Sequence, residues 1–248
     1  MDLQDLRVRI DAIDRQIVQL LNDRYEVVKK VGEWKRERGQ PLYVPEREKA
    51  LLEKLESINA GPMPDSTLRA VYREIMSGAL RLESPLKVAF FGPEATFTHL
   101  AAKMKFGHAI DYIPKASISD VFHEVEAGRS NYGCVPVENS TEGVVNHTLD
   151  MLVDSPLKIC AEINMCVQQC LLARCDKLQI RVIYSHAQSL GQCRQWLTEN
   201  FPEADQVAVA SNARAAELAA REEGAAAIGS ELAADVYKLK LLEQGIQE

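Results

Sequence analysis

The sequence predicts a multidomain protein in which an all-α region, residues 1–84, precedes an α/β region, residues 86–248. Residues 2–38 contain no proline and a single glycine, and their apolar residues recur at helical spacing. Beyond residue 85, short runs rich in β-branched and aromatic residues alternate with helical segments, which is typical of α/β domains. Hydrophobic residues make up 46% of the chain, enough for a sizeable core.

In the first region, helices are expected over residues 2–38, 46–58 and 65–82. At about 1.5 Å per residue the first helix would be about 55 Å long, and Gly39 with Pro41 marks its end. Pro45 suits the first turn of the second helix, and Asp65 or Ser66 can cap the third. A helix as long as the first cannot fold back on itself, so we expect a second chain to supply its packing partners.

The second region is expected to alternate strands and helices. Strands are predicted at residues 87–91, 111–113, 132–136, 157–163, 167–173, 182–185, 206–210 and 225–228. Helices are predicted from residue 97 onward and at residues 118–127, 144–152, 189–200, 213–221 and 230–237.

Composition excludes several classes of function. The formal net charge is −7, so no general basic field favours nucleic acid or an anionic membrane. The N-terminal residues lack the apolar run of a secretory signal, and no stretch reaches the roughly 18 apolar residues of a membrane span. We therefore expect a cytoplasmic protein whose six cysteines are reduced thiols. The cysteines form no CxxC pair, so no metal site is expected.

The first expected helix carries basic residues within its apolar face. In a helical projection Arg24 and Lys35 fall near the centre of that face, and Arg7 falls at its edge. One interpretation is that these basic side chains are simply solvated, as Arg and Lys on helices ordinarily are. A second interpretation is that they form buried structural salt bridges. A charge that faces a core must be paired or must bind something. A buried pocket for a small polycarboxylate is therefore the third interpretation, and it explains the excess of positive charge economically.

The other two expected helices show the same pattern. Arg47 and Glu48 precede apolar residues at helical spacing on the second helix, and Glu83 follows the apolar face of the third. On the first helix, Arg24 and Lys35 are about 16 Å apart along the axis and point in similar directions, so both can reach one ligand. Arg7 is about 25 Å from Arg24. If all three bind one small molecule, Arg7 comes from another subunit, which predicts a homodimer.

The residues that carry this pattern resemble those of the all-helical chorismate mutases. The matching segments are Leu6-Arg7, Ile10, Ile13-Asp14, Leu20 to Arg24, Val31 to Lys35 and Pro45 to Glu48. The resemblance covers nearly all of residues 1–84 and implies a chorismate mutase domain forming an intertwined three-helix dimer. Chorismate's two carboxylates would then meet Arg7 of one chain and Arg24 of the other.

The same resemblance implies the remaining roles in the mutase site. Lys35 would face the ether oxygen of chorismate, and Arg47 and Glu48 would hold the ring substituents. Many members of this family have Ser and Gln where Ala79 and Glu83 stand. Glu83 would therefore be catalytic only when protonated, because only then can it donate a hydrogen bond to the ether oxygen.

In the second region, polar segments follow predicted strands, where ligands bind in open α/β sheets. They are Gly92 to Phe97, Pro136 to Gly143 and Tyr184 to Cys193. Each alone is compatible with ordinary turn and capping chemistry. His186 with Cys193 suggests a thiol hydrolase, but no third orienting group is evident. His99, His108 and His123 are interpreted as surface residues.

Together, and in this order, these segments are similar to prephenate dehydratase, and the match runs from Lys87 to the end. The resemblance implies two α/β lobes like those of periplasmic binding proteins, with prephenate bound between them and no cofactor. It assigns catalysis to Asn139 and Gln192. The substrate-binding positions it implies are Thr96, Ser140, Thr141, Ser185 and Gln188.

The joined resemblances imply both mutase and dehydratase steps of phenylalanine synthesis. The printed sequence ends at Glu248, whereas relatives continue with an Asn-x-Thr-Arg-Phe segment and a regulatory ACT domain. We therefore expect impaired dehydratase activity and no feedback by phenylalanine. An alternative hypothesis is a mutase joined to a non-catalytic prephenate-binding module. A solute-binding protein is a further alternative, which the helical region opposes.

Overall fold

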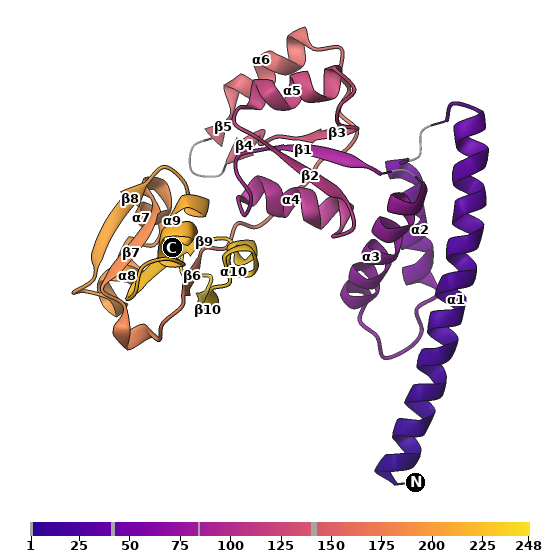
Figure 1. Ribbon diagram of the computed structural model, residues 1–248, viewed down its shortest axis with the longest axis horizontal. Helices are drawn as coiled ribbons and strands as arrows, with labels where there is room; N and C mark the ends of the chain where they lie inside the picture. Colours follow the sequence, from indigo (N-terminus) through magenta and orange to yellow (C-terminus); the bar gives the residue numbers. More distant parts are fainter. Residues whose placement is uncertain (1, 41–42, 84, 140–142) are drawn as a thin grey trace. The chain divides into compact units, whose positions relative to one another are not determined.

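The computed structural model describes residues 2–40, 43–83, 85–139 and 143–248 (Figure 1). Its contacts divide the chain into two compact units. One comprises Met1–Lys87 with Lys105–Asp111, and the other comprises Val88–Met104 with Tyr112–Glu248. Lys105–Asp111 thus belongs by its contacts to the helical unit, although it follows the first strand of the α/β region in sequence. The boundary expected between residues 84 and 86 stays a prediction.

The helical unit contains α1 (Leu3–Glu37), α2 (Pro45–Ser57) and α3 (Asp65–Glu83), whose ends lie within one residue of the expected bounds. A capping box starts α1, in which Asp2 accepts a hydrogen bond from the Asp5 amide and the Asp5 carboxylate accepts one from the Asp2 amide. No helix among the described residues is long and apolar enough to cross a membrane.

Helices α1 and α3 approach closely around Tyr25. Its hydroxyl donates a hydrogen bond to the Ile75 carbonyl at 2.9 Å. A Cβ atom on Gly78 would lie 2.4 Å from the same hydroxyl oxygen, so a side chain there would collide with Tyr25. Burial raises the pKa of Tyr25, opposed by the nearby charge of Arg24. Glycine at position 78 therefore permits the contact that fixes the middle of α1 against α3.

The first sheet of the α/β unit has the strand order β2-β1-β3, with β1 at Lys87–Phe91, β2 at Asp111–Lys115 and β3 at Tyr132–Cys134. Strands β1 and β3 are parallel. Figure 1 shows α4 (Phe97–Phe106) and α5 (Ile118–Glu126) on opposite faces of this sheet. The hairpin β4 (Glu138–Asn139) and β5 (Gly143–Val144) follows, and α6 covers Asn146–Asp154.

The second sheet has the strand order β10-β6-β9-β7-β8. Its strands are β6 (Cys170–Ala173), β7 (Val182–His186), β8 (Asp205–Val209), β9 (Ala225–Gly229) and β10 (Lys240–Gln244). Strands β7, β8 and β9 are parallel, whereas β6 pairs antiparallel with β9 and β10. The associated helices are the 3₁₀ turn η1 (Lys177–Gln179), α7 (Ala187–Gln192), α8 (Arg194–Asn200), α9 (Asn212–Ala219) and α10 (Glu231–Tyr237).

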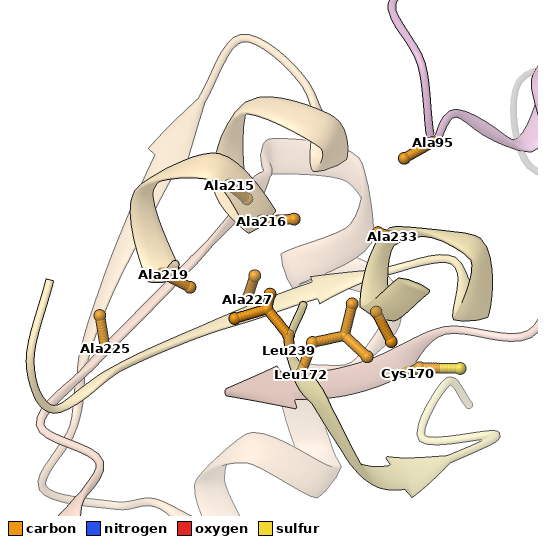
Figure 2. Packing of buried hydrophobic residues seen from close by; sticks show 11 residues of the cluster. Ala95, Cys170, Leu172, Ala215, Ala216, Ala219, Ala225, Ala227, Ala233 and Leu239 are labelled. Carbon is orange, nitrogen blue, oxygen red and sulfur yellow. The ribbon is translucent and has the colours of Figure 1, made fainter. Parts of the chain in front are cut away.

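Strand β9 is buried on both faces, as expected of a central strand. Successive side chains point to opposite sides of a sheet. Ala225 and Ala227 accordingly face the alanines of α9 and α10, whereas Ala226 and Ile228 face Leu197 of α8. Figure 2 shows the first of these clusters, in which the small side chains of α9 lie near β9. Alanine on both elements allows the helix to approach the sheet closely.

The expected fold class is confirmed, because a three-helix region precedes an α/β region. Some individual strands are wrong. The strand expected at residues 157–163 is absent from these described residues, and β6 starts at Cys170 rather than at residue 167. Ile159 is 74% exposed, so its segment has the composition of a strand without the neighbouring strand that would pair with its backbone.

The helix expected at residues 189–200 is interrupted at Cys193, where α7 ends and α8 begins. The carbonyl of Gln192 accepts a hydrogen bond from the Glu248 amide at 2.8 Å, instead of continuing the helical ladder. Strand β10 was not expected either. It is a strand because its backbone pairs with β6, and that partner lies far away in sequence.

Candidate active sites

Arg24 and Lys35 are both partly buried on α1. The Nη1 atom of Arg24 is shielded from solvent and has no hydrogen-bond partner among the described residues. An unpaired buried charge is costly unless a ligand or another chain completes it. A guanidinium binds carboxylates especially well because it offers several donors in a fixed plane. The environment of Arg24 therefore suits an anionic ligand.

Arg7 lies far along the same helix and is exposed. The separation from Arg24 is about 25 Å along the axis, so one copy of α1 cannot bring both to a small molecule. The apolar residues around Arg7 are exposed as well, with Ile10 at 55% and Ile13 at 53%. The exposed apolar face of α1 comprises Leu3, Leu6, Ile10, Ile13, Ile17, Val31 and Trp34. An exposed apolar surface of this kind is typical of an interaction surface.

The predicted residues on α2 and α3 differ in their surroundings. Arg47 is exposed, whereas the side chain of Glu48 is only 16% exposed and pairs with Lys105 at 3.2 Å. Glu83 is the last residue of α3, and its side chain lies outside the part of the chain that is described. Ala79, one turn earlier, is buried.

The turn between β1 and α4 uses several of its donors internally. The hydroxyl of Thr96 donates to the Pro93 carbonyl at 3.1 Å and accepts from the His99 amide at 3.4 Å. The Ala95 amide donates to Nδ1 of His99 at 3.1 Å. Ala95 has a φ of 67°, in the left-handed region. The amide of Ala95 is therefore committed to His99, which leaves fewer turn donors for a ligand.

The interpretation of His99 as a surface residue is wrong, because its side chain is 4% exposed and stacks on Phe90 with ring centroids 4.4 Å apart. Burial, and secondarily the charge of Lys103, lowers the pKa of His99 to about 4. Its Nδ1 atom accepts from Ala95, so the neutral ring carries its proton on Nε2. The sequence signal for this hydrogen bond is the position of His99, four residues after Ala95 in the turn.

Asn139 lies at the end of β4 and is partly buried. It pairs with Gly143 across the hairpin. Ser140 and Thr141, predicted to bind substrate, lie outside the described residues. Their flanks are fixed, because the Val145 amide donates to the Val137 carbonyl at 2.8 Å and Thr148 donates to the Pro136 carbonyl at 2.7 Å.

Ser185, at the end of β7, has no exposed surface. Its hydroxyl lies 3.0 Å from Oδ1 of Asn212 and 3.1 Å from the Ile228 carbonyl, both of which accept hydrogen bonds. Asn212 Oδ1 also accepts from the His186 amide at 3.0 Å, and its Nδ2 donates to Ser189 at 2.9 Å. In this arrangement Ser185 orients Asn212 and holds β7, β9 and α9 together.

Sequence reasoning did not select Asn212. A signal for it exists, because Asn212 comes shortly after β8 at the start of α9, and polar residues that follow parallel strands share one edge of the sheet.

Gln188 and Gln192 lie on α7. The Nε2 atom of Gln188 is shielded and without a hydrogen-bond partner in the described chain. Gln192 Oε1 accepts from Nε2 of Gln169 at 3.0 Å. Gln169 is 2% exposed, and its amide donates to Gln247 at 2.8 Å. Residues near the end of the chain therefore help to fix the amides beside α7.

Neither Cys193 nor Cys134 is an activated nucleophile. Burial raises the pKa of Cys193 to about 12 and that of Cys134 to about 11, so both are protonated at neutral pH. The described residues contain no cluster of His, Cys, Asp or Glu suited to a metal ion. A hollow lined by Leu178, Ile180 and Phe201 contains none of the predicted site residues.

Family models match both regions of the chain. A model of chorismate mutase type II matches residues 6–84, and a model of prephenate dehydratase matches residues 88–248. The structure thus joins an all-helical mutase domain to an α/β dehydratase domain. The chain belongs to the family of bifunctional chorismate mutase/prephenate dehydratases.

Relatives and solved structures agree with this assignment. A bifunctional chorismate mutase/prephenate dehydratase of Aquifex aeolicus is 45% identical over 100% of this chain and 70% of its own length. The crystal structure of prephenate dehydratase from Arthrobacter aurescens, in complex with L-Phe, has a TM-score of 0.59 at 32% identity, covering 65% of this chain and 56% of that one. A solved quorum-quenching acylase has a TM-score of 0.60 at 25% identity, covering 65% of this chain and 60% of that one.

The buried state of His99 predicts an acid-sensitive stability. The folded protein binds this proton near pH 4, whereas an unperturbed histidine binds it near 6.5. The contribution is therefore complete above pH 6.5 and is lost as the pH falls toward 4, by roughly 3 kcal/mol in total. We expect His99→Gln, which cannot titrate, to flatten the pH dependence of the free energy of unfolding in this range, as measured by urea denaturation.

The matched control is His123→Gln, which removes an exposed histidine from α5. This variant should retain the slope of the unaltered protein. Identical slopes for all three proteins would contradict the buried, neutral state of His99.

Proposed function

We propose that this chain rearranges chorismate to prephenate in its helical domain and converts prephenate to phenylpyruvate in its α/β domain. Family membership supports both reactions. The structural observation that supports the mutase reaction is the shielded Nη1 atom of Arg24, which has no hydrogen-bond partner among the described residues. The proposal includes the cytoplasmic location expected from the sequence, because both substrates are intermediates of amino acid synthesis.

The mutase reaction needs no nucleophile, because it is an intramolecular rearrangement in which one C–O bond breaks as a C–C bond forms. The site must hold the reactive conformer and stabilise charge that develops on the ether oxygen. Arg24 binds one carboxylate, and Lys35 donates a hydrogen bond to the ether oxygen. Arg47 and Glu48 hold the ring substituents. One preorganised donor of this kind is worth roughly 3–4 kcal/mol.

The mutase site is completed by a second copy of the chain. Arg7 of that copy supplies the other carboxylate contact, since Arg7 and Arg24 of one helix lie about 25 Å apart. The exposed apolar face of α1 supports the same proposal, because pairing two such helices covers it. Each exposed Leu or Ile contributes roughly 1.5–3 kcal/mol when fully buried. The homodimer is therefore proposed both from the ligand geometry and from the unpaired apolar surface.

In the dehydratase domain, prephenate loses its ring carboxylate as carbon dioxide, and the electron pair of that C–C bond enters the ring. The ring hydroxyl leaves as hydroxide, which takes up a proton to form water, and the ring becomes aromatic. Hydrogen-bond donors that assist the departing hydroxide suffice for catalysis. Asn139 and Gln192 are proposed for this role. Thr96, Ser140, Thr141 and Gln188 are proposed to bind the substrate.

Ser185 was expected to bind prephenate, and it is proposed instead to position Asn212. Its buried hydroxyl is engaged with Asn212 and the Ile228 carbonyl, so its influence on the substrate would pass through Asn212. The quorum-quenching activity of the structural neighbour is not proposed for this chain, because no observation on the described residues favours an acyl-transfer site.

A product-resolved assay tests the proposed function. With chorismate as substrate, prephenate and phenylpyruvate are quantified separately over time. Arg24→Ala should lower mutase kcat/KM at least about 100-fold, because a buried carboxylate contact is lost. Arg15→Ala, on the opposite side of α1, should change it little. Absence of prephenate formation, or equal effects of the two variants, would refute the proposed mutase site.

If Glu83 takes part in the mutase reaction, the rate of that reaction should depend on pH. Glu83 donates a hydrogen bond to the ether oxygen only when protonated, whereas the amide of a glutamine donates at any pH. We expect mutase kcat/KM to rise toward mildly acidic pH and the Glu83→Gln variant to give a flatter profile. A pH–rate curve that the substitution leaves unchanged would count against this role.

A further inference from the structure

Lys105 lies near the end of α4, within the part of the sequence that matches prephenate dehydratase, yet it contacts the helical unit. Its ammonium group is 3.2 Å from Oε1 of Glu48 on α2. The side chains of Lys105 and Glu48 are 22% and 16% exposed. The mutase helices thus receive a charged partner from a segment outside the residues that match a chorismate mutase.

This ion pair differs from the exposed pairs of the same unit. Lys49 and Glu53, also on α2, are 3.9 Å apart, and their side chains are 79% and 60% exposed. Exposed pairs of that kind are screened by water and contribute little. A shielded pair interacts more strongly, and loss of one partner leaves the other charge uncompensated. Lys105 also lies 5.8 Å from the ring centroid of Tyr43, which is 5% exposed.

The segment that follows Lys105 is pinned to α3. The Ala109 amide donates to the Ser77 hydroxyl at 3.1 Å, and the His108 amide donates to Glu74 at 3.1 Å. Gly107 has a φ of 77°, and a Cβ atom there would lie 2.5 Å from Cβ of Ser77. The backbone therefore approaches α3 too closely for any residue larger than glycine. These contacts fix where Lys105 emerges and limit the positions that its ammonium group can reach.

We propose that Lys105 is a positioning residue of the mutase site, which holds the Glu48 carboxylate in place for the ring substituents of chorismate. The inference rests on the role proposed for Glu48. A carboxylate has about four acceptor positions, so the bond to Lys105 leaves Glu48 able to accept from a substrate hydroxyl. The α/β region thereby contributes a residue to the site of the other reaction.

The contact between Glu48 and a ring substituent exists in both the bound substrate and the transition state. Loosening it weakens both states equally, which raises KM and leaves kcat nearly unchanged. We expect Lys105→Gln in the full chain to raise KM for chorismate roughly three- to ten-fold. Lys105→Arg keeps the charge and should restore most of the affinity. A general loss of folding would instead lower the amount of active protein and therefore the apparent kcat.

The experiment measures steady-state mutase kinetics for the unaltered chain, Lys105→Gln, Lys105→Arg, Glu48→Gln and the double variant Lys105→Gln/Glu48→Gln. Lys49→Gln is the matched control, because it removes an exposed lysine beside Glu48 on α2. The control should leave KM unchanged. In the Glu48→Gln background, Lys105→Gln should have little further effect, since its partner is already neutral.

Two outcomes overturn the inference alone, while leaving the proposed function intact. One is a KM for Lys105→Gln equal to that of Lys49→Gln, in a series where Glu48→Gln still raises KM. The other is an effect of Lys105→Gln that persists undiminished in the double variant. Failure of Glu48→Gln to alter the kinetics, or absence of mutase activity in the unaltered chain, would overturn the proposed role of Glu48 and this inference with it.

Discussion

The main constraint on the helical unit is the partly buried cation of Arg24, which has one donor atom without an acceptor in the described chain. Nη1 of Arg24 is shielded by its surroundings and has no acceptor in the described chain. A shielded donor without an acceptor costs free energy, which an acceptor from a ligand would offset. The proposed dianionic ligand and second subunit would together supply the missing acceptor. The exposed apolar face of the same helix would also be covered by a second subunit.

In the α/β unit, polar side chains at the ends of β7 and β9 bond to one another, whereas Nε2 of Gln188 has no partner among the described residues. The hydroxyl of Ser185 and the side-chain amide of Asn212 bond to each other, to backbone groups near the ends of β7 and β9, and to the Ser189 hydroxyl on α7. Gln169 similarly holds Gln192. Such networks restrict the side chains that remain available for a ligand, and preorganised donors require little reorganisation during a reaction. The polar segments thus consist of positioning residues as well as contact residues.

Much of the fold could be predicted because local sequence and tertiary structure agree. The helical spacing of apolar residues and the absence of proline predicted α1, and a strand was expected at residues 225–228, where β9 lies. The strand expected around Ile159 and the unbroken helix across Cys193 could not be judged locally. Their outcome depends on backbone partners that lie far away in sequence, as the hydrogen bond from the Glu248 amide to the Gln192 carbonyl shows for the helix.

The sequence singles out the residues expected to touch the ligand directly, and their roles stay predictions. Arg24 and Lys35 stand out because charge within an apolar face is unusual. Lys105, Asn212 and His99 were not singled out, because their contacts are with another side chain or with the backbone, and periodicity does not reveal such contacts. Ionic and hydrogen-bonded partners distant in sequence become visible only when the chain is folded.

Subunit complementation tests the shared dianion site most directly. Arg7→Ala and Arg24→Ala chains are each inactivated, then mixed, dissociated and allowed to reassociate. If each site combines Arg7 of one chain with Arg24 of the other, a mixed dimer has one site with both substitutions and one intact site, and random pairing restores about a quarter of the original mutase activity. Recovery near that level is the predicted result. A mixture that stays as inactive as its two components, although mixed dimers have formed, would contradict the account.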